Sequence, residues 1–152
     1  MNDTIAFFHR DKTEIAQLIS NISLNERIKY LCHVEGDTLV LDYRFFKSVA
    51  VPETLAYLMQ LVIDNIHNIL REYPLYNVCI CMKSLTVSDV DRYKNFIFEF
   101  ATRLKTEFQD KMNKCYIYRA PYVFEKVYSI VSCVIDKPTR QKIIVVENNL
   151  KK

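Results

Sequence analysis

The chain of 152 residues contains one glycine, Gly36, and carries a formal net charge of +3. Phosphate-binding and dinucleotide-binding loops, the hydrolase nucleophile elbow and the EF-hand loop all need glycine where the backbone turns tightly, so the sequence excludes them. Half of the residues are apolar and 26% are charged, which is typical of a folded domain. The charge is too small to indicate nucleic acid as a partner.

The cysteines and histidines do not form a metal-binding pattern. The five cysteines lie mostly in apolar segments without a CxxC pair, and the three histidines are far apart. We therefore predict free, buried thiols, no metal and no cofactor. The N-terminal segment does not fit a signal peptide, and no stretch reaches the ~18 apolar residues of a membrane span. The sequence predicts a cytoplasmic protein.

The first 35 residues predict a helical N-terminal extension in two short pieces. Thr13 is the expected cap of a helix over residues 14–20. Ser23 and Glu26 have the spacing of a capping box that begins the second helix. The turn around Gly36 then leads into the first predicted strand.

The rest of the chain alternates strands with helices. The first long helix is predicted to begin at Pro52, the second to be capped by Ser88, and both repeat apolar residues at the spacing of one helical face. A third helix begins at Pro121 and is apolar on most sides, which is typical of a helix that is buried or faces a ligand. The predicted strands cover residues 38–42, 77–82, 115–118 and 143–146.

This order predicts an α/β fold, a mostly parallel β-sheet with helices packed on it. Neither a linker nor an internal repeat interrupts the pattern. We therefore predict a single domain over residues 1–152, with residues 1–35 as the helical extension and 38–146 as the core.

No catalytic set can be assembled from the sequence. His67 lies on the polar side of the first long helix, and His33 lies near a strand end beside Cys32. Asp89 and Asp91 are placed to stabilise a helix N-terminus. The sequence therefore predicts a protein that is not an enzyme.

Three segments carry a family resemblance. Residues 108–121 (FQDKMNKCYIYRAP) resemble the pattern Tyr-Pro-Glu-Arg-Met-Gly-Lys-x-Tyr-Ile-Ile-Asn-Ala-Pro of the CRAL-TRIO lipid-binding family, which includes phosphatidylinositol and phosphatidylcholine transfer proteins. Residues 136–143 (DKPTRQKI) resemble its Asp-Pro-x-Thr-x-x-Lys-Ile. Residues 81–91 are similar to its Asp-x-x-Gly-Leu-Ser loop. Ser84 replaces the glycine of that loop, and Asn113 replaces the glycine that closes the long helix.

The resemblance covers roughly residues 38–146 and implies an apolar cavity, between sheet and helices, for one hydrophobic ligand. In phosphoinositide-binding members an acid, a threonine and a lysine hold the headgroup, and the matching residues here are Asp110, Thr139 and Lys142. The same residues also fit a turn cap and ordinary surface charges. The expected apolar pocket comprises Phe124, Val127, Ile130, Val131 and Val134.

The resemblance is to a reduced form of the family. The N-terminal helical module corresponds at most to Thr13–Leu31, and no gating helix is expected after the last strand. The expected partner is a hydrophobic lipid or phosphoinositide, with transient contact to a membrane surface.

The alternative is a lipid-free module that serves in protein interaction or as a structural component of an assembly, such as a viral one. A protein partner would then cover the open side, while aromatic side chains fill the cavity. A void of about 300 Å³ or more beside the helix at 121–135 favours a lipid, and a packed interior favours the alternative.

Overall fold

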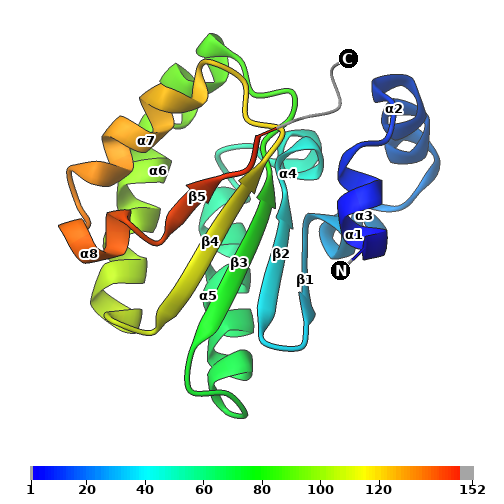
Figure 1. Ribbon diagram of the computed structural model, residues 1–152. Helices are drawn as coiled ribbons and strands as arrows, with labels where there is room; N and C mark the ends of the chain where they lie inside the picture. The colour runs from blue at the N-terminus through cyan, green and yellow to red at the C-terminus, as the bar shows by residue number, and fades with distance from the viewer. Residues whose placement is uncertain (1, 148–152) are drawn as a thin grey trace.

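The computed structural model describes residues 2–147, which form one five-stranded sheet in the order β1-β2-β3-β4-β5 (Figure 1). β1 is antiparallel to β2, and the other neighbouring strands are parallel. The prediction of an α/β fold with a mostly parallel sheet is confirmed. The strands are β1 Cys32–Glu35, β2 Thr38–Asp42, β3 Tyr76–Cys81, β4 Met112–Tyr118 and β5 Ile143–Val145.

Helices occupy most of the remaining chain. Three precede the sheet, and the others connect its parallel strands. In chain order they are α1 Asn2–Phe8, α2 Lys12–Asn21, α3 Leu24–Leu31, α4 Tyr43–Val49, α5 Leu55–Leu70, α6 Val87–Phe108, α7 Phe124–Ser132 and α8 Lys137–Arg140.

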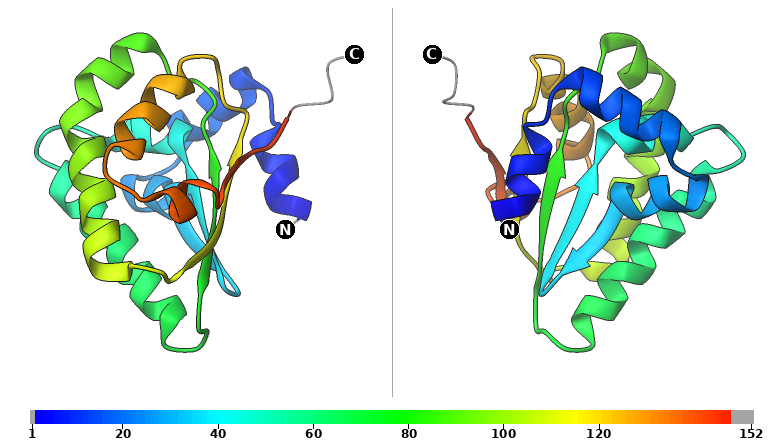
Figure 2. Two further views of the ribbon diagram at one scale, coloured as in Figure 1. Left: turned by 60° about the vertical axis from the view of Figure 1, so that its left-hand side comes forward. Right: turned by 90° about the vertical axis from the view of Figure 1, so that its right-hand side faces the viewer.

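The strand order explains why the long connecting helices lie on one side. The connections from β2 to β5 always step to the next strand in the same direction, and parallel crossovers are right-handed, so their helices must cover the same face. Figure 2 shows α5, α6 and α7 on this face, here named the front face, and α1 on the opposite or back face.

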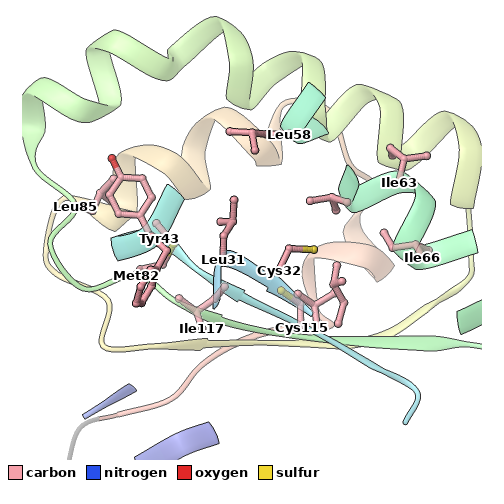
Figure 3. Close-up of a cluster of buried hydrophobic side chains, with 14 of the residues drawn as sticks. Leu31, Cys32, Tyr43, Leu58, Ile63, Ile66, Met82, Leu85, Cys115 and Ile117 are labelled. Atoms are coloured by element: carbon pink, nitrogen blue, oxygen red, sulfur yellow. The ribbon is translucent and has the colours of Figure 1, made fainter. Parts of the chain in front are cut away.

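Both faces of the central strands are buried, but by different elements. Leu39, Val78 and Ile117 belong to the large front-face core, part of which is shown in Figure 3 together with Ile63 of α5. On the back face, Phe8 of α1 packs in a smaller cluster with Val40, Cys79 and Cys81. This double burial accounts for the near-continuous apolar sequence of the strands.

The N-terminal part differs from the sequence prediction in three places, the first being α1, a third helix beyond the two that were predicted. The capping box of Ser23 is confirmed, because its hydroxyl accepts from the N–H of Glu26 at 3.2 Å. The N-cap of α2 is Asp11 and not Thr13. Residues 32–35 form a strand and not a helix, because Gly36, with φ of 63°, closes a hairpin with β2.

The starts of the later helices also differ. Thr86, and not Ser88, caps α6, since its hydroxyl accepts from the N–H of Asp89 at 3.1 Å and its own N–H donates to the Asp89 carboxylate at 3.1 Å. Pro52 and Pro121 lie in turns, so that α5 begins at Leu55 and α7 at Phe124.

Within residues 2–147, no helix is long and apolar enough to cross a membrane. The same residues contain no cluster of three or more metal-ligating side chains. Four of the five free cysteines are buried, and Cys133 is exposed.

Candidate functional site

A cavity of about 250 Å³ lies between the front face of the sheet and helices α5, α6 and α7. Its floor is formed by apolar side chains of the parallel strands, including Leu41, Ile80 and Ile117. The volume is below the roughly 300 Å³ at which ligand pockets usually begin. The interior is therefore not packed solid, but it holds less than a typical ligand pocket.

Helix α6 supplies the largest part of the wall. Its lining residues follow the helical repeat that the sequence shows, because residues three and four apart lie on one face. The repeat was visible in the sequence, but it does not distinguish a cavity wall from filled core. The lining residues of α6 are Phe96, Ile97, Phe100, Ala101, Leu104, Lys105 and Phe108.

Helix α7 contributes part of the predicted pocket. Phe124, Val127 and Val131 line the cavity at helical spacing. Ile130 and Val134 are not among the lining residues; Ile130 packs against the hydrophobic core. Tyr128 and Ile135, which were not predicted, also line the cavity.

Polar side chains gather at one end of the cavity, where α6 ends and where β4 and β5 begin. This polar end includes all three residues matched to the family's headgroup site. The backbone N–H of Cys115 donates to the carbonyl of Lys142 at 2.9 Å, which fixes the start of β5 beside β4. The polar end consists of Lys105, Gln109, Asp110, Asp136, Thr139 and Lys142.

Asp110 ends the long helix as well as lining the cavity. Its backbone has φ of 65°, the left-handed conformation that follows many helix C-termini, and its side chain is exposed. Asn113, the expected site of the helix-closing glycine, lies instead in β4. Aspartate adopts the left-handed conformation more readily than most non-glycine residues.

Thr139 is engaged by the neighbouring Asp136. The Asp136 carboxylate caps α8 and accepts from the N–H of Thr139 at 2.9 Å. Hydrogen bonds from the side chain and backbone of Thr139 hold the pKa of Asp136 below its ordinary value, and the charges of Lys105 and Lys142 act in the same direction. The polar end thus balances two lysines against two aspartates.

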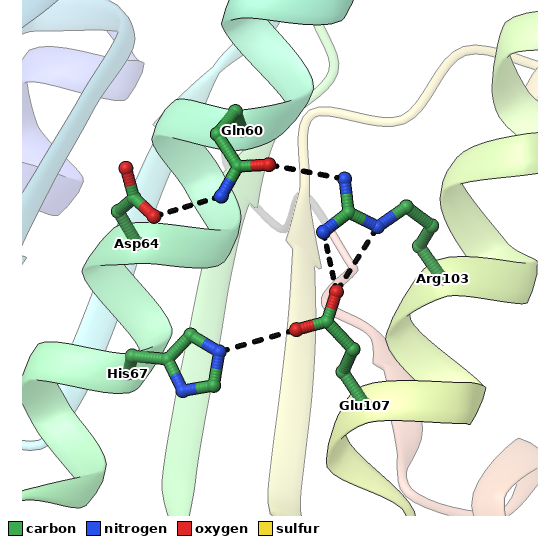
Figure 4. A network of polar contacts seen from close by, with 5 residues as sticks. All are labelled: Gln60, Asp64, His67, Arg103 and Glu107. Atoms are coloured by element: carbon green, nitrogen blue, oxygen red, sulfur yellow. Dashed lines mark hydrogen bonds and ion pairs between the residues drawn. The ribbon is translucent and has the colours of Figure 1, made fainter.

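A polar network joins α5 to α6 beside the cavity (Figure 4). Arg103 donates to Gln60 across the two helices at 3.2 Å and forms an ion pair with Glu107 on its own helix. His67 Nε2 lies 3.1 Å from Glu107 Oε2 and makes a second link between the helices. Because these groups are solvent-exposed, their contacts contribute little to the free energy of unfolding. Their main effect is to link α5 to α6.

Known proteins share both the sequence pattern and the fold of this chain. Residues 10–152 match the CRAL/TRIO domain family. The crystal structure of Sfh5 superposes with a TM-score of 0.67 at 16% identity, covering 82% of this chain and 50% of that chain. The chain thus spans about half the length of this structural relative, and the likeness shows a shared fold.

No curated protein matches the sequence significantly. Because the family match extends over most of its length, the chain belongs to the CRAL/TRIO domain family, a family of lipid-binding domains.

Proposed function

We propose that the protein is a non-enzymatic lipid-binding or lipid-transfer domain that holds one hydrophobic ligand in the front-face cavity. The observation that carries the proposal is an apolar cavity that has polar side chains at one end. The hydrocarbon part of the ligand lies against α6 and α7, as well as the floor of the sheet. Each methylene moved from water into this cavity contributes about 0.8 kcal/mol.

The headgroup of the ligand lies at the polar end of the cavity. Lys142 pairs with a phosphate, the Thr139 hydroxyl donates to it, and Asp110 accepts from headgroup hydroxyls. Lys105 provides a second ammonium group at this end. To donate to the ligand, the Thr139 hydroxyl must give up its side-chain hydrogen bond to Asp136. A phosphoinositide has both the phosphates and the hydroxyls that this arrangement suits.

The same proposal includes the cellular setting. A transfer protein must contact a membrane surface transiently to exchange its ligand, and the thiols, four of them buried, fit the reducing cytoplasm. We also infer that residues 1–152 act as a single domain, since α1 packs on the same sheet as α5 to α7.

Lipid uptake by delipidated protein tests the proposal, with native mass spectrometry as the readout. Val131 lines the cavity on α7, so Val131→Phe fills the space and should lower uptake of phosphatidylinositol at least about tenfold. Val134→Phe is the matched control, because Val134 does not line the cavity. Failure of the unmodified protein to take up fatty acid, phosphatidylcholine or phosphatidylinositol would contradict the proposal.

A third variant separates the headgroup from the hydrocarbon chain. Lys142→Gln removes an ammonium at the polar end and should weaken phosphatidylinositol uptake while leaving fatty-acid uptake intact. Lys137→Gln is the control, since Lys137 lies in the preceding short helix α8 and does not line the cavity. If Lys142→Gln and Lys137→Gln lowered phosphatidylinositol uptake equally, the headgroup would not bind at the polar end.

Two observations favour a lipid-free interaction module as a second candidate. The cavity is smaller than usual for a ligand site, and Tyr122 at the start of the α7 region is 94% exposed. Exposed tyrosine is enriched at protein interfaces. A protein that takes up no lipid but binds a protein partner through the surface around Tyr122 would support this candidate.

A further inference from the structure

Three basic residues follow elements that end near one edge of the sheet, the edge where the parallel strands end. Lys83 follows β3, Arg119 follows β4, and His9 follows α1. The strand ends are adjacent, because Cys81 pairs with Tyr118 and the N–H of Met82 donates to the carbonyl of Tyr118 at 2.9 Å. Three segments distant in sequence therefore meet at one edge.

The contact between Arg119 and His9 fixes the proton on the imidazole. Arg119 Nη1 lies 2.8 Å from His9 Nδ1. A guanidinium has only donors, so Nδ1 accepts, the imidazole is neutral, and its proton is on Nε2. The Phe8 ring beside His9 packs against Tyr118 at 5.5 Å between centroids, which holds this end of α1 on the back face.

The cationic side chains at this edge are not all paired with a carboxylate. Within residues 2–147, neither Lys83 nor Arg119 takes part in an ion pair. The nearby Arg44 is neutralised by Asp42, which it contacts at 2.8 Å through Nη2 and at 3.0 Å through Nε. Asp42 is 1% exposed, so its charge is used within this buried pair.

Electrostatics at His9 agree with the geometry. Burial lowers the pKa of His9, and the charges of Arg119, Arg44 and Lys83 lower it further. Every charged group that shifts this pKa is a cation. Since Arg44 is paired with Asp42, the remaining positive potential at His9 comes from Arg119 and Lys83, and an anion would relieve it.

These cations are not explained by stabilisation of the α1 C-terminus alone. Arg44 already performs that role, since its Nη2 donates to the carbonyl of Phe7 at 3.1 Å. Arg44 is 5% exposed, yet its Nη1 has no hydrogen-bond partner among the described residues. Because Arg44 Nη1 is buried, a ligand cannot reach it, and the donors left at this edge are those of the partly exposed Lys83 and Arg119.

We propose that His9, Lys83 and Arg119 form a binding site for a phosphate group on the back face, separate from the front-face cavity. The Lys83 ammonium, the free N–H groups of Arg119 and the Nε2–H of His9 donate to the phosphate oxygens. Both a free phosphate and a phosphorylated lipid headgroup carry this chemistry. Because the site lies across the sheet from Val131, it is tested independently of cavity binding.

Titration with inorganic phosphate, followed by NMR of the labelled histidine rings at constant ionic strength, tests the site. His9 signals should shift saturably, whereas His33 and His67, which bond to Glu35 and Glu107, serve as internal controls. Vesicles of phosphatidylcholine, with and without a phosphatidylinositol monophosphate, form the second arm. A response to the doped vesicles alone assigns the phosphate to a lipid headgroup, and a response to phosphate alone assigns it to a soluble source.

Matched variants make the outcome specific. Lys83→Ala and Arg119→Asn should each weaken phosphate binding at least about tenfold, as expected for loss of a charge-assisted hydrogen bond. Asparagine is chosen at position 119 because φ there is 56°. Lys94→Ala, an exposed charge on α6, should leave binding unchanged. Equal shifts of all three histidines, no shift of His9, or unchanged binding by the folded Lys83→Ala variant would overturn the proposal.

Discussion

At the scale of single residues, four positions have a backbone conformation that residues other than glycine usually avoid. Gly36 has positive φ, and so do Ser84, Asp110 and Arg119. A side chain in the left-handed conformation costs roughly 1–2 kcal/mol, so surrounding contacts must hold each of these positions. At Ser84 the carbonyl accepts from Lys47 Nζ at 2.9 Å. The family resemblance is consistent with the positive φ of Ser84, since this residue replaces the glycine of the family's loop.

Ser84→Gly should therefore stabilise the protein. Glycine relieves the strain at φ of 77° but loses more entropy on folding, so the expected net gain is about 0.5–1 kcal/mol. Urea unfolding measures it. Ser88→Gly, within the first turn of α6, is the control and should destabilise by a similar amount. A destabilised Ser84→Gly protein would show that the serine side chain contributes more than its backbone strain costs.

At the scale of elements, side-chain caps decide where the helices begin. Proline and serine patterns placed the starts of α5, α6 and α7 within a few residues of their observed positions. Thr86 caps α6 because its hydroxyl reaches the free N–H of Asp89, a residue that is buried and also contacts Lys47 at 3.0 Å. Thr86 and Asp89 have the spacing of a capping box, a local signal that the sequence prediction missed, and the contact of Asp89 with Lys47 of α4 adds to it.

Alanine substitution distinguishes the two possible caps. Thr86→Ala should lower the free energy of unfolding by about 1 kcal/mol, since it leaves a helix N–H without its partner. Ser88→Ala should be neutral or slightly stabilising, because alanine has the higher helix propensity. Chemical denaturation of both variants provides the comparison. If Ser88→Ala were the more damaging change, the N-terminal assignment of α6 would be wrong.

At the scale of the whole molecule, the sheet separates two buried layers and places thiols in both. Cys115 lies in the front-face core, whereas Cys79 and Cys81 lie in the back-face cluster. Burial raises the pKa of Cys79 and Cys81 to about 11, and of Cys32 and Cys115 to about 12, from 9.0. Folding therefore favours the protonated thiols.

Stability should fall in alkaline solution for this reason. Between pH 9 and pH 11 the unfolded chain has lost thiol protons that the folded chain keeps, so each buried thiol removes on the order of 1 kcal/mol per pH unit. Their contribution is fully present below pH 9. Urea midpoints measured from pH 7 to pH 10.5 test the slope, which Cys115→Ser should reduce.

Thiol labelling at pH 8 provides an independent check. In the folded protein only Cys133 should react, since it alone is exposed. Cys133→Ser should abolish labelling. Rapid modification of several thiols in the folded protein would show that the buried layers open readily, and the alkaline effect would then lose its basis.

The sequence by itself determined the order of the central strands and helices and the mostly parallel sheet, because apolar periodicity and turn residues act over short distances. It did not determine β1, which exists only because it pairs with β2. The headgroup candidates were proposed from resemblance, while only the tertiary structure places Asp110, Thr139 and Lys142 along one cavity. His9 and Arg119, which are 110 residues apart, meet for the same reason. Right-handed crossovers send α5, α6 and α7 to one face, which leaves the other to α1, and local sequence patterns carry no information about contacts across that sheet.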